Sequence, residues 1–364
     1  MSTADRLLAG PRGRRLLLEF ALEAEEVRGV EQRSDSLHYA VVQAAHHLTS
    51  GRDDGRVAYA AFGDGADDVW RTVVTPDEVA HRLSGMQLPD VTPDGLRVAL
   101  AQAVDTAMYW QEPDGVDVLN ATEPVRRELR RVGEHIARSL HSQWWTTPPA
   151  LTDQWSVWTW GDDCPDLPVP TAADRLHLWG ERTLVNEERA ARDPSTSFFG
   201  WWSTPPTRSS TRRLADGTPA GLWFVEDSMG WERAVTRCLT ISAGAEVYEI
   251  DGRKAWAELC RRFPLEVTAQ IGEDWRRTTG RSGRWVVPGW TLVASEYEGV
   301  HLTVAGYLAA AGTAIDVDAD TASVIAGWGP DETYWLTDAL VGGDFQTWRC
   351  DTAGRHPRWA EEPR

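Results

Sequence analysis

The stretch Trp144-Trp145-Thr146-Thr147-Pro148-Pro149 divides the chain into two halves of different composition. Only two of the 20 tryptophans precede it, whereas aromatic residues stay frequent from there to the end. An abrupt change in composition beside a proline pair is typical of a domain boundary. The sequence therefore predicts one domain over residues 1–143 and a tryptophan-rich domain over residues 144–364. Pro148-Pro149 and Pro165–Pro170 are the two linker candidates.

Helix signals dominate the first domain. Thr92-Pro93-Asp94 and Thr122-Glu123-Pro124 each supply a capping hydroxyl and an early proline ahead of apolar residues at helical spacing. Thr75-Pro76-Asp77-Glu78 has the pattern of a capping box and predicts a further helix. Val57–Phe62 and Val69–Val74 are read as the two strands of a β-hairpin. The first domain is therefore expected to be mainly helical with one hairpin.

The second domain contains short strand-like runs with helices at about 171–192 and 252–262. Irregular mixing of strands and helices favours an α+β fold, with mostly antiparallel strands, over a doubly wound sheet. The runs are Trp155–Trp160, Gly221–Val225, Glu246–Ile250, Arg284–Val287, Val300–Val304, Ser323–Ala326 and Thr333–Leu336.

Charge and cysteine usage exclude several classes of protein. The net charge of −18 disfavours nucleic acid and anionic membranes as partners, because binding to them depends on basic residues. No apolar run approaches the roughly 20 residues of a membrane span. Cys164, Cys238, Cys260 and Cys350 are widely spaced and form no zinc-binding pattern, so no metal is expected. Reduced thiols fit a cytoplasmic protein best.

Lysine is almost absent, since Lys254 is the single lysine among the 37 basic residues. This bias is typical of high-GC bacteria and suggests an actinobacterial chain. The sequence contains no phosphate-binding GxxxxGK[ST] loop. Schiff-base chemistry would have to use Lys254, which is expected in a solvated first helical turn.

The tryptophans, histidines and acids offer candidate functional groups. Most tryptophans are expected to pack in the core, but their flat faces can also bind sugars, bases or cations. Neighbouring residues of a strand point to opposite faces, so one tryptophan of each adjacent pair should face outward. His301 is the histidine of most interest, because it lies on a buried-looking strand. The 55 acidic residues give no basis for choosing a glycosidase carboxylate pair without geometry.

Three segments of the second half carry a possible enzymatic pattern. The segment Leu178–Leu184 contains an arginine, the next is Trp201-Trp202-Ser203-Thr204-Pro205, and Ser295–His301 contains Glu-x-Glu ahead of a strand. In this order they resemble the Arg, Ser-Thr and Glu signature of ADP-ribosyltransferases. The intervening residues 221–251 also resemble the strand, short helix and strand succession of that fold.

The resemblance implies NAD as cofactor and assigns a role to each matching residue. Glu298 would hydrogen-bond the ribose next to nicotinamide and stabilise oxocarbenium character, and Arg182 would hold phosphate or ribose. Ser203 would shape the nicotinamide cleft with Thr204 beside it. The remaining matches are Glu296, which would select or activate the acceptor, and Trp202, which would stack on nicotinamide.

The chain departs from the family pattern in two ways. It has Ser-Thr-Pro where the family usually shows Ser-Thr-Ser, and Arg175 or Arg189 matches the arginine position almost as well as Arg182. Two functions therefore stay open. One is an NAD-dependent ADP-ribosyltransferase-like enzyme in the second half. The other is a non-enzymatic binding or interaction protein, with an aromatic-lined cleft for a small molecule or a protein partner.

Overall fold

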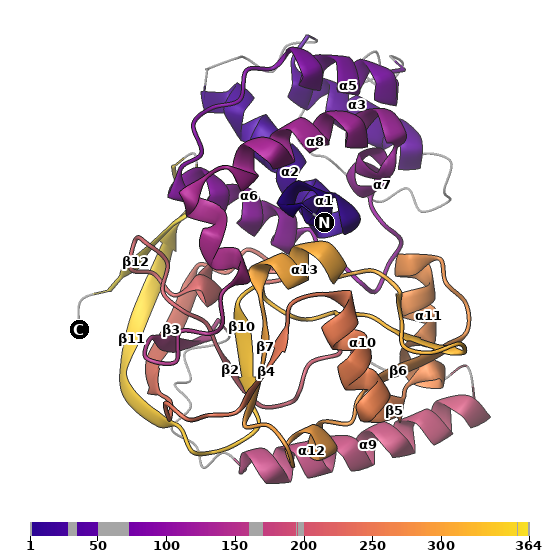
Figure 1. The fold of residues 1–364 in the computed structure, drawn as a ribbon, viewed down its shortest axis with the longest axis vertical. Coiled ribbons are helices and arrows are strands. Elements are labelled where there is room, and N and C mark those ends of the chain that lie inside the picture. The colour runs from indigo at the N-terminus through magenta and orange to yellow at the C-terminus, as the bar shows by residue number, and fades with distance from the viewer. Residues whose placement is uncertain are drawn as a thin grey trace. The chain divides into compact units, whose positions relative to one another are not determined.

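The computed structural model describes residues 2–27, 35–49, 73–159, 170–193, 195, 200–354 and 356–362. The architecture is α+β, which confirms the predicted fold class (Figure 1). The chain divides into two compact units, one formed by Met1–Ala103 and Glu112–Ser142 and the other by Val104–Gln111 and Gln143–Arg364. All but the last two residues of the expected hairpin lie outside the described residues, as does Cys164.

The described part of the first unit is helical, and helices begin beside Thr75, Thr92 and Thr122 as predicted. The hydroxyl of Thr122 does not cap its helix, however, because it donates to the carbonyl oxygen of Leu119 instead. At α5 the Thr75 hydroxyl accepts from the Glu78 amide at 3.3 Å, while the Glu78 carboxylate accepts from the Thr75 amide at 2.7 Å. The apolar stripe of α8 is buried, as its spacing predicts. The elements are α1 (Thr3–Ala9), α2 (Pro11–Val27), α3 (Leu37–Thr49), α5 (Pro76–Gly85), α6 (Pro93–Asp105), α7 (Gly115–Ala121), α8 (Glu123–Ala137) and the 3-10 helix η1 (Leu140–Thr146).

A buried ionic cluster joins α2 to α7 within this unit. Arg12 pairs with Asp117 and donates to the carbonyl oxygen of Ala103 at 2.8 Å. Arg15 lies 3.0 Å from Asp114, which caps α7. Arg12, Arg15 and Asp117 are buried, and each has an oppositely charged partner, which offsets the cost of removing its charge from water.

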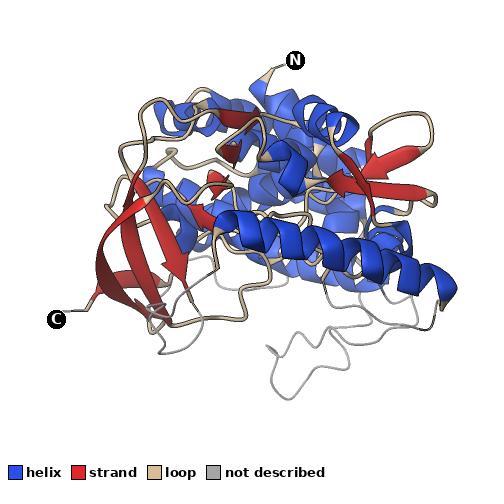
Figure 2. Ribbon diagram, turned by 90° about the horizontal axis from the view of Figure 1, so that it is seen from below, coloured by secondary structure: helices blue, strands red, loops and turns tan. Residues whose placement is uncertain are grey.

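The second unit contains three four-stranded sheets, with strand orders β1-β3-β11-β12, β2-β10-β7-β4 and β5-β6-β9-β8. Paired strands are antiparallel except in the β4–β7 and β6–β9 pairs. Figure 2 shows the long, curved strands of the first sheet. The strands are β1 (Gln154–Trp158), β2 (Arg208–Ser210), β3 (Arg233–Thr240), β4 (Val247–Ile250), β5 (Pro264–Glu266), β6 (Arg284–Pro288), β7 (Gly299–Leu302), β8 (Ile315–Asp316), β9 (Thr321–Ser323), β10 (Glu332–Trp335), β11 (Val341–Asp351) and β12 (Arg358–Glu361).

Helices cover these sheets, and tryptophans fill the space between them. Helix α10 packs against β4 and α13 (Figure 1). The rings of Trp256, Trp290 and Trp328 lie 6.0 to 6.3 Å apart, and those of Trp275 and Trp285 lie 5.5 Å apart. All five of these tryptophan side chains are buried, so they pack in the core of the second unit. The helical elements of this unit are α9 (Ala172–Arg192), η2 (Ala220–Leu222), α10 (Arg253–Arg262), α11 (Thr268–Thr279), α12 (Trp290–Val293) and α13 (Val304–Ala310).

Two local predictions for the second unit are wrong. Residues 221–225 form the end of η2 and a turn instead of a strand, and the expected short helix near Trp231 is replaced by the start of β3. β3 is held by hydrogen bonds to β1 and β11, which come from distant parts of the chain. Among the described residues, none of the helices has the length and apolar character needed to span a bilayer.

Candidate functional site

Two residues predicted from the resemblance, Arg182 and Ser203, lie in different settings within the second unit. Arg182 is on an exposed side of α9. The hydroxyl of the buried Ser203 accepts hydrogen bonds from the Ala326 amide at 3.0 Å and the Trp328 indole at 3.3 Å. Ser203 thereby fixes the loop before β2 to the segment after β9.

Glu296 and Glu298 also have partners within the protein. Glu296 pairs with Arg262, whose guanidinium donates to the Tyr297 hydroxyl at 2.8 Å. Glu298 accepts a hydrogen bond from the Glu246 amide at 3.1 Å and so joins the beginnings of β4 and β7. No hydrogen bond or ion pair joins Arg182, Ser203 and Glu298 to one another in the part of the chain that the structure describes.

Trp202 is the outward-facing member of its tryptophan pair. Its side chain is 53% exposed, and its ring lies 5.7 Å from that of Trp201. The sequence predicted that one tryptophan of the pair would face outward because the segment was expected to be a strand. The segment is a loop, so the alternation of side chains along a strand does not explain the exposure of Trp202. A Cβ on Gly327 would overlap the Trp202 side chain, with Cβ and Cγ of Trp202 at 2.9 Å. Gly327 thus provides the space that Trp202 occupies.

Two carboxylates and two hydroxyls are linked to the loops that carry Trp202 and Gly327. The Gly327 amide, which lies against Trp202, donates to Glu226 Oε2 at 2.6 Å. The Tyr307 hydroxyl donates to Glu226 Oε1 at 2.8 Å. Tyr307 is buried, whereas Trp202, Thr204, Glu226, Glu332 and Tyr334 each retain some solvent exposure. We call this group the tryptophan–carboxylate site, made of Trp202, Thr204, Glu226, Glu332 and Tyr334.

Glu332 is the carboxyl group of this site that burial affects most. Its Oε2 accepts from the Gly329 amide at 2.7 Å. Burial raises the pKa of Glu332 to about 6, although hydrogen bonds from Ser209, Gly329 and Tyr334 act in the opposite direction. Burial also raises the pKa of Tyr334 well above its usual value, and the charges of Glu332 and Glu226 add to this effect. Both carboxylates therefore lie within electrostatic range of the Tyr334 hydroxyl.

Sequence reasoning did not select Glu226 or Glu332. The stretch Gly327-Trp328-Gly329-Pro330-Asp331-Glu332 holds the one available signal, since two glycines and a proline ahead of a strand are typical of a tight, specific loop. The amides of Gly327 and Gly329 each bind one of the two carboxylates. Without these contacts, the two acids resemble any others in the chain.

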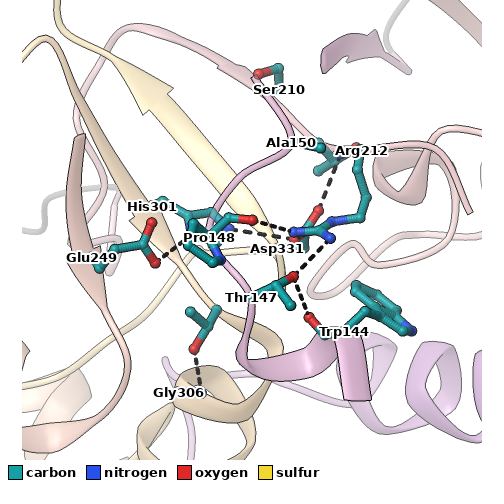
Figure 3. A network of polar contacts seen from close by, with 12 residues as sticks. Trp144, Thr147, Pro148, Ala150, Ser210, Arg212, Glu249, His301, Gly306 and Asp331 are labelled. Carbon is teal, nitrogen blue, oxygen red and sulfur yellow. Dashed lines mark hydrogen bonds and ion pairs between the residues drawn. The ribbon is translucent and has the colours of Figure 1, made fainter. Parts of the chain in front are cut away.

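Glu332 and Tyr334 lie on one face of the sheet β2-β10-β7-β4. The other face of this sheet carries a charged network around His301 (Figure 3). His301 is fully buried, with Nδ1 2.9 Å from Glu249 Oε2 and Nε2 3.4 Å from Asp331 Oδ1. Arg212 Nε donates to Asp331 Oδ1 at 2.7 Å. The same guanidinium reaches Thr147 Oγ1 at 3.0 Å and the carbonyl oxygen of Pro148 at 2.8 Å.

The partners of His301 favour its charged form. Burial lowers the pKa of His301, but hydrogen bonds with Asp331 and Glu249 outweigh this effect and raise it above the usual value. Both ring nitrogens of a protonated histidine are donors, so the imidazolium can serve both carboxylates. In the sheet, Ser210, Thr333, His301 and Glu249 form one row across β2, β10, β7 and β4.

The network also determines how β10 begins. Asp331 has a left-handed backbone with φ of 66°, which is unfavourable for a residue other than glycine. Its side chain is held by Arg212 and His301, and its amide donates to the carbonyl oxygen of Leu302 at 2.9 Å. Because Asp331 directly precedes Glu332, the network positions Glu332 at the tryptophan–carboxylate site.

No group of three or more histidine, cysteine or acidic side chains is arranged to hold a metal ion, as far as the described residues extend. None of the five side chains that define the tryptophan–carboxylate site is basic. Its chemistry combines one exposed aromatic face with hydroxyl and carboxyl groups. No protein-family model matches the chain, and no curated protein or solved structure matches it.

Proposed function

We propose that this protein binds a small molecule containing a sugar ring at the tryptophan–carboxylate site. The observation that supports this most directly is the exposed Trp202, which is 53% accessible and lies against the amide that binds Glu226. The apolar face of a sugar can stack on an indole ring. Its hydroxyl groups can donate to carboxylates, in hydrogen bonds strengthened by the negative charge.

The chemistry of the other side chains supports a neutral, hydroxyl-rich ligand. Thr204 and Tyr334 can both donate and accept hydrogen bonds, as sugar hydroxyls require. Two carboxylates would repel a phosphate or another anion. A ligand with an apolar face and several hydroxyls uses all five side chains of the site. This proposal specifies the binding-protein alternative as one for a small molecule.

ADP-ribosyl transfer from NAD is a second proposal. The observation in its favour is that Trp202 is exposed beside Ser203 and Thr204, so a nicotinamide ring could stack there. The Ser203 hydroxyl is already engaged by Ala326 and Trp328, which reduces what it can offer to a ligand. Glu298 would have to exchange its bond to the Glu246 amide for one to ribose.

A thermal-shift experiment on the full-length protein separates these proposals. Neutral monosaccharides, neutral oligosaccharides and NAD would each be titrated, because a ligand that binds the folded state raises the melting temperature. We expect a sugar to produce a shift that Trp202→Ala abolishes. The control is Trp359→Ala, which alters a tryptophan on β12 in a different sheet and should leave the shift intact.

Each outcome has a defined meaning. A sugar-dependent shift lost only in Trp202→Ala supports the sugar proposal. A shift with NAD alone, abolished by Glu298→Gln, supports ADP-ribosyl transfer instead. Absence of any sugar-dependent shift contradicts the proposed function.

A further inference from the structure

Trp110 and Trp202 have the two most exposed tryptophan side chains in the described part of the chain. Their exposed fractions are 39% and 53%, whereas the other described tryptophans are buried or half-buried. Both residues belong to the second unit. Trp202 is part of the tryptophan–carboxylate site, and Trp110 has no role in the proposed function. An exposed indole can stack on the apolar face of a ligand, so the position of Trp110 relative to Trp202 matters.

A row of aromatic rings connects the two exposed tryptophans. The ring of Trp202 lies 5.7 Å from that of Trp201, and the ring of Trp201 lies 5.8 Å from that of Tyr109. Tyr109 directly precedes Trp110 in the chain. The aromatic contacts therefore run without a break from Trp202 to the residue next to Trp110.

A second, polar path connects the same two tryptophans. The indole nitrogen of Trp110 donates to Asp227 Oδ2 at 3.4 Å. Asp227 follows Glu226, whose Oε2 accepts from the Gly327 amide at 2.6 Å, and Gly327 lies against the Trp202 side chain. The aromatic and the polar paths together form a closed ring of contacts. Trp110 and Trp202 are therefore neighbours on one part of the surface of the second unit.

The loop that begins at Glu226 is fixed beside Trp110. Asp227 has a left-handed backbone with φ of 49°, which persists only where the surroundings hold it. Asp105 provides these contacts, because its carbonyl oxygen accepts from the Asp227 amide at 3.2 Å and its Oδ1 accepts from the Ser228 amide at 3.0 Å. The Asp227 carboxylate is thus held next to the exposed indole of Trp110.

We propose that Trp110 is a second sugar-binding position and that the ligand is a neutral oligosaccharide, with one ring stacked on Trp202 and another on Trp110. This inference rests on the proposed sugar binding and names the class of sugar. A carboxylate has acceptor positions for several donors, so Asp227 can bind sugar hydroxyls as well as the Trp110 indole. Once one ring of an oligosaccharide is bound, the second position is filled by the same molecule, which raises the affinity.

Calorimetric titration of the full-length protein tests this. The ligands are the cello-, malto- and manno-oligosaccharides from the monosaccharide to the hexasaccharide. We expect one series to bind more tightly as the chain lengthens. Trp110→Ala should weaken the hexasaccharide of that series about 10-fold, the size expected for one aromatic stacking contact, and should change the monosaccharide affinity much less. Trp202→Ala should weaken both ligands. Trp359→Ala, on β12, is the control and should leave both affinities unchanged.

A second variant separates stacking from the hydrogen bond to Asp227. Trp110→Phe keeps an aromatic face and removes the indole donor. It should retain most of the hexasaccharide affinity that Trp110→Ala loses. If Trp110→Phe loses as much as Trp110→Ala, the effect comes from the loop contact, and Trp110 is not a sugar-binding position.

Two other results would overturn the inference while leaving sugar binding intact. One is a hexasaccharide that binds no more tightly than its monosaccharide. The other is an equal loss of monosaccharide and hexasaccharide affinity in Trp110→Ala, which would mean that Trp110 acts through Glu226 on the tryptophan–carboxylate site. If no sugar of any series binds, the proposed function itself fails.

Discussion

Placing His301 between Glu249 and Asp331 makes its protonation part of the folding equilibrium. Burial lowers the pKa of His301, but its two hydrogen-bonded carboxylates raise it overall, above the value of an unfolded histidine. A raised histidine pKa contributes stability that is fully present below about 6.5 and is lost as pH rises through the folded pKa. The network should therefore be strongest in mildly acidic solution.

A pH series on one variant checks this. His301→Gln should reduce the free energy of unfolding more at pH 6 than at pH 9, because only the protonated histidine gains from both carboxylates. Urea denaturation at the two pH values measures the difference. A loss that is the same at both would show that His301 is neutral in the folded protein.

The buried ion pair beside it gives a second prediction. Asp331→Asn keeps a side chain that tolerates the left-handed backbone at φ of 66° and removes the charge opposite Arg212. Breaking a buried pair should cost about 3 to 5 kcal/mol of unfolding free energy. Glu188→Gln breaks an exposed pair with Arg192 on α9 and should cost less than about 1 kcal/mol. Similar losses in both variants would contradict this difference.

Gly327 offers a test of how Trp202 is held. Gly327→Ala adds a Cβ that overlaps the Trp202 ring at a position with φ of 80°. Gly217→Ala is the matched control, since its φ is 84° and nothing lies within 4 Å of the added Cβ. Both should lose about 1 to 2 kcal/mol for the left-handed backbone. Gly327→Ala alone should also abolish the thermal shift caused by sugar, whereas retained binding would show that Trp202 does not depend on Gly327.

Sequence patterns anticipated the exposed tryptophan of the candidate site and could not select its acids. A tryptophan either packs in the core or presents its ring face to a ligand, so the adjacent pair Trp201-Trp202 could be selected as a candidate binding position. Glu226 and Glu332 differ from other acids only through contacts with Gly327, Gly329 and Tyr334. Such contacts depend on the folded chain. Ser203 was selected from the sequence pattern, but its hydroxyl forms a hydrogen bond within the protein, with the amide of Ala326.

At the scale of helices and strands, local signals were informative where a cap or an apolar period was present. Helices α5, α6 and α8 begin at or next to the predicted capping residues, and strands β4, β6 and β10 fall on predicted apolar runs. The sequence of β11 has no regular spacing of apolar residues. It contains Gly342 and Gly343, where the register of β11 with β3 shifts. It forms because β3 supplies hydrogen-bonding partners, which no local pattern describes.

The caps themselves can be tested on α5 and α8. Thr75→Ala removes both hydrogen bonds of the hydroxyl in a complete capping box and should cost about 1 kcal/mol of unfolding free energy. Thr122 precedes α8 without a side-chain capping bond, so Thr122→Ala should cost less. Urea denaturation of the two variants gives the comparison. An equal or larger loss for Thr122→Ala would show that the box adds little.

At the scale of the whole molecule, the second unit includes the segment Val104–Gln111 in addition to its continuous stretch, Gln143–Arg364. This segment belongs to the second unit although it lies between the two parts of the first. Tyr109 packs edge-on against Trp201 at 5.8 Å and closely against Gly312. The segment also contains Trp110, one of the two tryptophans that precede residue 144.

A truncated protein tests this dependence. Residues 143–364 alone lack the segment and should melt at a lower temperature than the second unit does in the full chain. Tyr109→Ala in the full chain should lower the melting temperature of the same unit. Thermal denaturation followed by tryptophan fluorescence reports on this unit, which holds most of the tryptophans. Equal melting temperatures would mean that the segment contributes little.

The position of Val104–Gln111 also has a consequence during synthesis. The Thr278 hydroxyl donates to the carbonyl oxygen of Gln111 across 167 residues of chain. At about 5 to 20 residues per second, that length takes about 10 to 30 s to translate. Tyr109 and Trp110 therefore leave the ribosome long before their partners exist. During that interval both side chains lack these partners, and the second unit can complete its fold only after Thr278 and Gly312 have been synthesised.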